Sequence, residues 1–523
     1  MIRVEYLPAD VLGLSALERD ALSGRSATLG VARRAEEVPP RESRDLPAER
    51  AHLAKWLEAR ATIHAPHVAV LESIRSLQHL GASCVVCEAF PQILLGPWSQ
   101  LLRALQTIAL ARRLSTASAP VVPVLWNHGD VHDAEALRRA RLPNRFFELQ
   151  TLELDGPAAG RAPIDQVTLE TERHGLGALR EVLRQLYGDY EHIDAALDVS
   201  CPREGESLTS AFTRGMYELL GAEGLVVVEP SPLRTELSHA AADVIGADWV
   251  GALRQASGDD SPLLAEAPLV HVTAGGCQPL YIGGEGYRYD GEPGSRTAAE
   301  LAAEVVQEPG AWRVGAPLRP LTRDLVLPVR AVVGDADALA HHAALAPVRA
   351  ALELPKVAFV PATCATLVDG EARDSLARFE VDLAEVLRCG GGWEPPAVEV
   401  PGSDALERLA AIEDETRARL AAERRGLVEI DPTLLPALKI AKGDIRDNFR
   451  RLAQKVEHAQ KNRAGKALRH TRRLNARLCP DERPQAEVLP PFTWLARQGP
   501  EWIGQLLGEL DPFGGEHLGV HLP

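Results

Sequence analysis

The segment VVPVLWNHGDVHDAEAL (residues 121–137) joins a short apolar run to a strongly polar turn. Residues 121–126 are uncharged and rich in valine, which is typical of a strand buried on both faces of a parallel sheet. Two histidines and two aspartates follow, namely His128, Asp130, His132 and Asp133. Open parallel sheets bind their ligands beyond the carboxyl ends of the strands. The segment therefore predicts an α/β fold with a functional site at this turn.

Apolar runs and amphipathic segments alternate around this strand. Further strands are predicted at residues 83–89, 224–230, 325–333 and 356–362, and helices at residues 48–60, 66–80, 98–114, 133–142, 207–220 and 335–352. Such alternation indicates a parallel sheet covered by helices on both faces. Residues 273–294 are rich in glycine and aromatic residues, and they predict a hairpin rather than a phosphate loop because no Lys-Ser/Thr ending or helix follows.

The character of the sequence changes at a glycine- and proline-rich linker, residues 389–402. Two long helical patterns follow, the first over residues 404–425 and the second from about residue 444 towards Arg477, joined through residues 426–432. The apolar positions of the second follow a coiled-coil seam: Leu438, Ile445, Phe449, Leu452, Val456 and Ala459. We therefore expect a core at residues 1–390, an antiparallel helical arm at residues 391–477, and a C-terminal segment at residues 478–523 that returns to the core.

The second helical pattern is basic, although the protein as a whole is acidic. Its basic residues are Lys439, Lys442, Arg450, Arg451, Lys455, Lys461, Arg463, Lys466, Arg469, Arg472, Arg473 and Arg477. They form either a solvated helix face or a contact for an anion or nucleotide.

Composition narrows the functional classes. The 523 residues carry a formal net charge of -16, which argues against general affinity for nucleic acid or anionic membranes. No apolar stretch reaches the ~20 residues that a membrane span requires, and the first residues lack a signal-peptide pattern. The seven cysteines are scattered, which favours a reducing, cytoplasmic location. Cys84 and Cys87 form a C-x-x-C pattern inside a predicted strand, where they face opposite sides and are expected to be structural.

The opening turn allows three interpretations. His132 is suited to acid–base chemistry near neutral pH, and Asp130 or Asp133 could orient it or hold an amine or hydroxyl of a substrate. Alternatively, one of these aspartates caps the helix predicted after the turn. A metal site made of His128, His132 and Asp133 is disfavoured, because Gly129 argues against the helical geometry that would bring both histidines to one side. We therefore expect no metal in this fold.

Several motifs, taken in order, resemble the cysteine-adding enzymes of bacillithiol biosynthesis. The family's Trp-x-x-x-Glu-Asp-His-Asp pattern after a core strand stands here as Trp126, Asp130, Val131, His132 and Asp133. Other matching segments are Gly96–Pro97, GLVVVEP (224–230), LRPLTRDLVLP (318–328), ATLVD (365–369), IDPTL (430–434), LCPDERPQAEV (478–488) and LDPFGGEHLGVHL (510–522). The resemblance runs from about residue 85 to the C-terminus.

The resemblance implies a Rossmann-like core of the class I nucleotidyltransferase type, with insertions, a C-terminal antiparallel coiled-coil arm and a homodimer formed through that arm. It also implies a ligase that joins the carboxylate of cysteine to the amine of glucosaminyl-malate, with ATP or another nucleotide activating the carboxylate. His132 would take the proton of the attacking amine, while Asp130 and Asp133 position the amino sugar. The implied substrate-binding residues are Trp126, Asn127, Gly96, Pro97, Arg319 and Asp324.

Arg319 could neutralise a carboxylate or phosphate, or it could form a structural ion pair with Asp324 or another acid. The chain also departs from the family pattern. Glu88, Ala89 and Phe90 replace a Gly-Gln-Gln or Gly-His-Gln loop, and the other departures are Val131, Ala338 and Ala362. The first hypothesis is a cysteine ligase or a divergent member with related substrates. The alternatives are a catalytically degenerate paralogue acting as a binding or scaffold protein, and a metal-dependent hydrolase.

Overall fold

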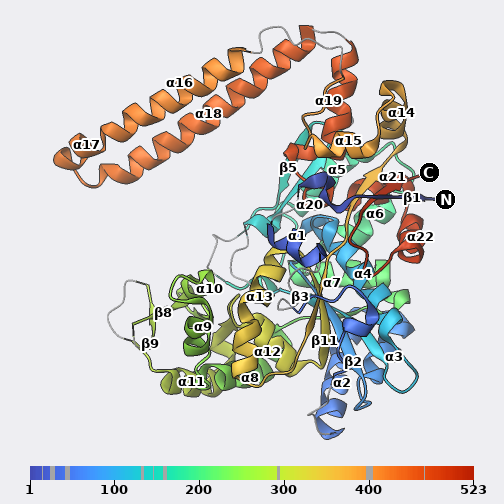
Figure 1. The fold of residues 1–523 in the computed structure, drawn as a ribbon, viewed down its shortest axis with the longest axis vertical. Coiled ribbons are helices and arrows are strands. Elements are labelled where there is room, and N and C mark those ends of the chain that lie inside the picture. Colours follow the sequence, from blue (N-terminus) through green and yellow to red (C-terminus); the bar gives the residue numbers. More distant parts are fainter. Residues whose placement is uncertain are drawn as a thin grey trace. The chain divides into compact units, whose positions relative to one another are not determined.

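The computed structural model describes residues 1–13, 16–23, 30–41, 47–130, 135–144, 147–156, 162–284, 286–290, 295–395, 404–463 and 466–523. The chain forms two compact units (Figure 1). The first comprises residues 1–370 and 483–523, and the second comprises residues 371–482. Within the described residues, no helix has both the length and the apolar character that crossing a membrane requires.

A five-stranded parallel sheet forms the centre of the first unit. Its strands, in spatial order, are β12 (Ala358–Pro361), β11 (Val329–Gly334), β2 (Ser83–Ala89), β3 (Val121–Asn127) and β6 (Val226–Val228). All neighbouring pairs are parallel. Every residue of β3 is buried, and so are all residues of β2 except Glu88. The parallel sheet predicted from the apolar runs is therefore confirmed, and it agrees with the Rossmann-like core that the resemblance implies.

The helices around this sheet are α2 (Pro47–Thr62), α3 (Val68–Ser76), α4 (Ser99–Leu114), α7 (Leu208–Leu220), α12 (Arg319–Val326) and α13 (Ala336–Ala351). Helix α4 connects β2 to β3 and packs on both strands. Cys84 and Cys87 are completely buried on β2, and burial raises their thiol pKa values to about 12 and about 11. The structural interpretation of the C-x-x-C pattern is thereby confirmed.

A four-stranded antiparallel sheet is inserted between β6 and β11. Its strands are β10 (Trp312–Val314), β7 (Leu269–Thr273), β8 (Gly276–Gly283) and β9 (Gly286–Tyr289), and the predicted hairpin is confirmed in β7, β8 and β9. Helices α8 (Arg234–Gly246), α9 (Trp249–Ser257) and α11 (Ala298–Gln307) belong to the same region. It has its own hydrophobic core, which includes Trp249, Tyr287 and Trp312.

The helix predicted over residues 133–142 is wrong. The described part begins with a 3-10 turn, Ala136–Arg138, and continues as β4 (Arg139–Pro143), which pairs with β5 (Leu149–Glu153). Ala140 and Leu142 are buried, whereas Arg139 is exposed, so the apolar period here is two residues. Since residues 136–143 form a 3-10 turn and a strand, the described residues do not contain the helix that Asp130 or Asp133 was expected to cap.

A third sheet joins the two ends of the chain. Strand β14 (His517–His521) lies between β1 (Arg3–Leu7) and β13 (Cys364–Val368), antiparallel to the former and parallel to the latter. The sequence did not predict β1, because its alternation of charged and apolar residues is short.

The second unit is helical. Its helices include α15 (Leu383–Arg388), α16 (Asp404–Ala422), α17 (Arg424–Ile430), α18 (Leu434–Arg463) and α19 (Lys466–Leu478). Helices α16 and α18 run antiparallel and pack along each other (Figure 1). The connection predicted at residues 426–432 is in fact mostly helical, as α17.

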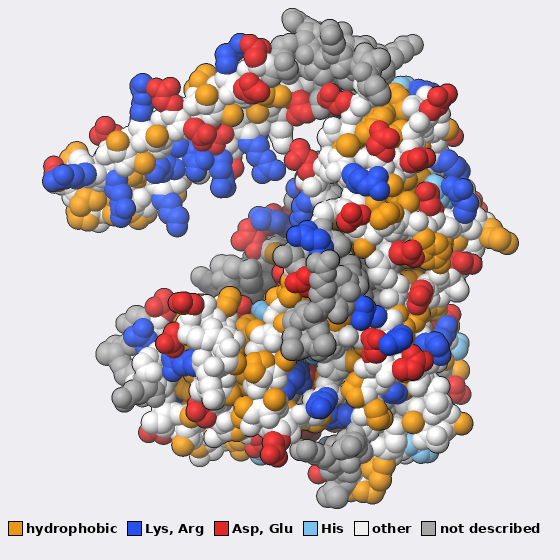
Figure 2. All heavy atoms as spheres, viewed as in Figure 1, with side chains coloured by type: hydrophobic (Ala, Val, Ile, Leu, Met, Phe, Trp, Pro, Cys, Tyr) orange, Lys and Arg blue, Asp and Glu red, His pale blue; other side chains and the backbone are white. Residues whose placement is uncertain are grey.

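The packing seam of this arm is only partly covered. Leu438 is buried and Phe449 is half-buried, but Leu452 is 45% exposed, and the side chain of Ala459 lies outside the described residues. Ile412 and Ile440 are also exposed, at 49% and 64%. Lys and Arg side chains gather along one edge of α16 and α18 (Figure 2).

Candidate functional site

The strand order creates a switch point between β2 and β11. The chain leaves β2 for β3 and β6 on one side, and then returns to β11 and β12 on the other side. Ligands of open α/β sheets bind at the carboxyl ends of the strands beside such a switch point. A cavity of about 250 Å³ opens there. Its polar lining comes from Glu88, Arg103, Arg319, Asp335, Asp337 and His341, and its apolar lining includes Phe90 and Pro320.

Glu88, near the end of β2, provides a carboxylate at this cavity. One of its oxygens accepts a hydrogen bond from Arg323, and the other lies 3.1 Å from Nε2 of His128. Burial opposes ionisation of Glu88, but the charges of Arg323 and His128 outweigh it and lower the pKa of the carboxyl. The side chain is 29% exposed, so it reaches the cavity while it stays ionised.

His128 lies behind Glu88 and does not line the cavity. Its side chain is 1% exposed, and the Phe90 ring stacks on its imidazole with 4.9 Å between ring centroids. Nδ1 of His128 is buried without a hydrogen-bond partner among the described residues.

Gly96 and Pro97 follow β2 in the loop that leads to α4. Gly96 has φ of 64°, and a Cβ there would come within 2.1 Å of Nε2 of Gln100. Gln100 holds Phe90 through both backbone groups, accepting from its N–H at 2.6 Å and donating to its carbonyl at 3.2 Å. Gly96 therefore makes room for the side chain that fixes Phe90 at the cavity.

Two arginines bring positive charge to the cavity. Arg103 of α4 pairs with Asp335, the N-cap of α13, whose carboxylate accepts from the N–H of Ala338. Arg319, at the start of α12, donates from Nε to the carbonyl of Val314 at 3.1 Å. Its terminal nitrogens make no hydrogen bond to the described residues, so they remain available to an anionic group in the cavity.

Asp324 lies outside the cavity lining, in a buried ion-pair cluster. It is 1% exposed, and it pairs with Arg323 at 2.8 Å and with Arg349 at 2.5 Å. Arg319 is not among its partners. Since Arg323 also binds Glu88, this cluster helps to hold the Glu88 carboxylate in place at the cavity.

The other residues singled out at the opening turn lie away from this cavity. Trp126 is 3% exposed, and Asn127 is buried, donating to the Thr209 carbonyl and to Oγ1 of Thr213. Oδ2 of Asp130 is 3.9 Å from Arg234. Val131, His132 and Asp133 lie outside the described residues, so the acid–base interpretation of His132 remains a prediction and the disfavoured metal site is not tested.

Asp130 belongs to a buried cluster of mixed charge. Asp165 is 3.9 Å from Arg234, and burial raises the pKa of this carboxyl. Arg313 of β10 lies in the same cluster, and burial together with Arg234 lowers its pKa to about 10. The cluster links the turn after β3 to the inserted antiparallel sheet. Among the described residues, no group of three or more His, Cys, Asp and Glu side chains has metal-binding geometry.

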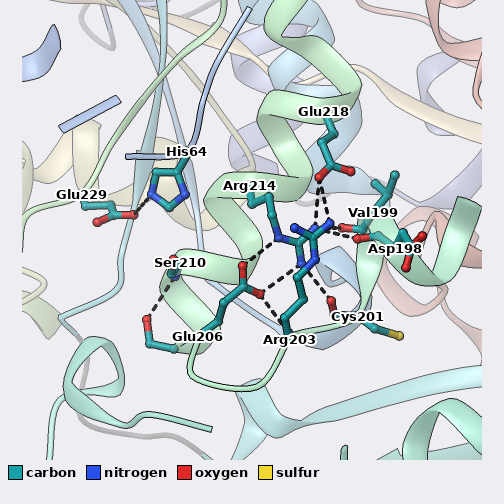
Figure 3. A network of polar contacts seen from close by, with 11 residues as sticks. His64, Asp198, Val199, Cys201, Arg203, Glu206, Ser210, Arg214, Glu218 and Glu229 are labelled. Carbon is teal, nitrogen blue, oxygen red and sulfur yellow. Dashed lines mark hydrogen bonds and ion pairs between the residues drawn. The ribbon is translucent and has the colours of Figure 1, made fainter. Parts of the chain in front are cut away.

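A second polar network lies along α7 (Figure 3). Arg214 binds Glu206 and Glu218, as well as the backbone carbonyls of Asp198 and Cys201. Nearby, Glu229 accepts hydrogen bonds from Arg60 and Thr213, and it lies 3.7 Å from His64. Arg214, Glu206 and Glu229 are held by several partners each, so we interpret the network as support for β6 and α7.

Sequence reasoning missed Arg103, Asp335 and Asp337 as cavity residues, and it noted Glu88 only as a departure from the family pattern. One signal was available. Residues 334–337 (GDAD) follow an apolar strand just as the polar residues of the opening segment do. What the sequence does not contain is the pairing of β11 with β2, which brings the two strand ends together.

The comparisons with known proteins identify both parts of the chain. Residues 31–249 match "Bacillithiol biosynthesis BshC, N-terminal Rossmann-like domain", and residues 365–522 match "Bacillithiol biosynthesis BshC, C-terminal coiled-coil domain". Proteins named "Putative cysteine ligase BshC" are similar over most of their length. That of Thermus thermophilus is 27% identical, over 82% of this chain and 86% of the relative. That of Shouchella clausii is 25% identical, over 90% of both.

Proposed function

Because this chain belongs to the BshC family of bacillithiol biosynthesis, we propose that it joins the carboxylate of cysteine to the amine of glucosaminyl-malate. The relatives carry the name of cysteine ligases, at identities near 25%. The observation that carries the proposal is the switch-point cavity, which presents a carboxylate from Glu88 and a guanidinium from Arg319. An enzyme that joins an acid to an amine must bind groups of both charges. We also propose a cytoplasmic location, since a free thiol substrate requires a reducing compartment.

We propose that ATP or another nucleotide activates the carboxylate, because a carboxylate is a poor acyl donor and needs a better leaving group. The residues present fit the anionic part of such a group: Arg319 lines the cavity with only its Nε hydrogen-bonded within the described residues, and Arg103 adds a second positive charge. A planar guanidinium binds carboxylate and phosphate oxygens equally well. Arg319 would thus hold the reacting end of the acid close to the activating group.

We assign proton removal from the attacking amine to His132, with Asp133 and Asp130 positioning the amino sugar. The support is their place in the chain: they follow β3, which is paired in register with β2, so that Trp126 lies opposite Glu88. An amine attacks only when it is unprotonated, and imidazole is the side chain whose ordinary pKa suits that transfer near neutral pH.

The direct test incubates purified protein with cysteine, glucosaminyl-malate and ATP, and then measures the mass of the products. We expect a new amide that depends on all three compounds. The relative from Shouchella clausii, named "Putative cysteine ligase BshC", serves as the control. If that control forms the amide and this chain does not, the ligase assignment is wrong. A binding or scaffold role then replaces it, and Phe90, which stands where the family has a polar loop residue, supports that role.

Replacing Arg319 with glutamine is expected to raise the KM for cysteine at least tenfold. The variant removes a charge-assisted hydrogen bond, which contributes roughly 1.5–3 kcal/mol. Glutamine keeps most of the side-chain volume, so the fold should persist. Steady-state kinetics of amide formation would measure the effect, and Arg254→Gln, in an exposed pair with Asp259, provides the control. An unchanged KM would exclude Arg319 from substrate binding.

We propose that the chain is a homodimer formed through the α16–α18 arm. The exposed Ile412, Ile440 and Leu452 on this arm are apolar groups that a second arm would cover. We expect light scattering to give twice the mass of one chain, and the double variant Ile440→Glu/Leu452→Glu to give a monomer. Asn448→Glu places the same charge at an exposed polar position of α18 and should leave the dimer intact. A dimer that survives the double change would place the interface elsewhere.

A further inference from the structure

The switch-point cavity holds two opposite charges that do not neutralise each other. Glu88 is bound to Arg323 and His128, whereas Arg319 is bound to the backbone carbonyl of Val314. Both side chains nevertheless line the same cavity, and Arg319 is close enough to influence the ionisation of Glu88. A ligand that carries both an ammonium and a carboxylate complements this arrangement.

The volume of the cavity limits the size of such a ligand. At about 250 Å³ it is smaller than typical pockets for drug-sized ligands, which begin at roughly 300 Å³. A free α-amino acid is a zwitterion of suitable size. The Phe90 ring, which is 41% exposed and fixed by Gln100, gives the cavity an apolar wall for the side chain of the acid.

The surroundings of Glu88 decide whether its carboxylate acts as a base or as the partner of an ammonium group. Burial acts against the charge, yet Arg323 and His128 lower the pKa of Glu88 below its usual range, so the group is ionised at neutral pH. A carboxylate of low pKa is a weak base, and it does not take a proton from an ammonium group. It is well suited to hold that ammonium as an ion pair.

We infer that Glu88 binds the α-ammonium group of the amino acid substrate, while Arg319 binds the carboxylate of the same molecule. This inference rests on the proposed function and adds the substrate-recognition role of a residue at which the chain departs from its family. His128 and Arg323 are positioning residues, since they orient the Glu88 carboxylate and do not line the cavity.

The assignment has a chemical consequence. An amino acid with an activated carboxylate can react with the amine of another amino acid and form an unwanted dipeptide. An ammonium held by Glu88 keeps its proton, so its nitrogen has no free electron pair with which to attack. The amine of the second substrate then remains the nucleophile, and the amide forms between two different molecules.

The test compares the binding of cysteine with that of 3-mercaptopropionic acid, which lacks the amine and keeps the thiol and the carboxylate. Isothermal titration calorimetry measures both dissociation constants without requiring turnover. We expect the wild-type protein to bind cysteine at least tenfold more tightly. In Glu88→Gln this preference should fall towards one, mainly because cysteine binds more weakly. A wild-type protein that binds the two acids equally, or that binds neither, overturns the inference.

Two further variants sharpen the experiment. Arg319→Gln should weaken both acids by a similar factor and keep the preference for cysteine, because both acids carry the carboxylate. Glu223→Gln, in an exposed pair with Arg112, should leave both constants unchanged. The ratio is measured within one preparation, so a partly unfolded Glu88→Gln sample does not distort it. A Glu88→Gln protein that keeps the wild-type ratio refutes the role of Glu88, even if amide formation itself is observed.

Discussion

Replacing Asp324 with asparagine is expected to lower the free energy of unfolding by about 3–5 kcal/mol. The variant keeps the size of the side chain and removes its charge. Arg323 and Arg349, which are 2% and 8% exposed, then lose their shared carboxylate inside the core. Arg323 keeps Glu88 as a partner. Arg349 has no second carboxylate among the described residues to replace Asp324, and its Nε and one terminal nitrogen already lack hydrogen-bond partners. An uncompensated buried charge is costly because it has lost its water.

Urea unfolding of the full-length protein, followed by tryptophan fluorescence, would measure this loss. Asp259→Asn is the matched control, because it removes the carboxylate from an Asp–Arg pair whose aspartate is 87% exposed. Pairs of that kind contribute at most about 1 kcal/mol. If Asp324→Asn lowers the free energy of unfolding no more than the control does, the cluster does not stabilise the core. A role for Asp324 in ligand binding would then be the better explanation of its place in the chain.

Mild acid is expected to destabilise the first unit by up to about 4 kcal/mol between pH 7 and pH 5. Burial lowers the pKa of both His342 and His517 to about 3, with Arg349 adding to the effect on His342. In the unfolded chain a histidine has a pKa of about 6.5. The unfolded state therefore binds more protons as the pH falls below 6.5, so the stability present above that value is lost towards pH 3, by about 2 kcal/mol per histidine at pH 5.

Unfolding free energies at pH 7, 6 and 5 would test this expectation, because few carboxyl groups titrate in that interval. His517→Gln should reduce the pH dependence by about half, and glutamine can keep a hydrogen bond to Oγ1 of Thr366, which lies 2.9 Å from His517. His79→Gln changes an exposed histidine and should retain the wild-type slope. Equal slopes in all three proteins would show that His517 does not contribute to the pH dependence of stability.

The sequence predicted the elements of the sheet better than their arrangement. Strands β2 and β3 were predicted from residues 83–89 and 121–126, because both runs are apolar and bounded by polar turns. The error at residues 133–142 has a local cause: alanine, leucine and arginine are good helix formers, and the pairing of β4 with β5 overrides that preference. Strand β1 escaped notice because it is ordered by partners that lie more than five hundred residues away.

The sequence pointed to the end of β3 and did not reveal the cavity at the end of the neighbouring strand, β2. The polar turn after β3 stood out because its histidines and aspartates are adjacent in sequence. Glu88, Arg103, Arg319 and Asp335 come from four separate segments, and only the order of β11, β2 and β3 brings these segments together. That order depends on long-range pairing, which no local pattern encodes.

The thiols on β2 allow the opening of the central sheet to be measured by chemical labelling. A thiol reacts through its ionised form, and the raised pKa values of Cys84 and Cys87 leave almost none of that form in the native state at neutral pH. An alkylating reagent therefore reaches these two positions when the middle strand separates from its neighbours, whereas it can modify the exposed Cys389 at once. The slow labelling of Cys84 and Cys87, resolved from that of the other buried thiols, measures how often the sheet opens. The same burial protects a protein that is proposed to handle a reactive thiol from forming mixed disulfides on β2.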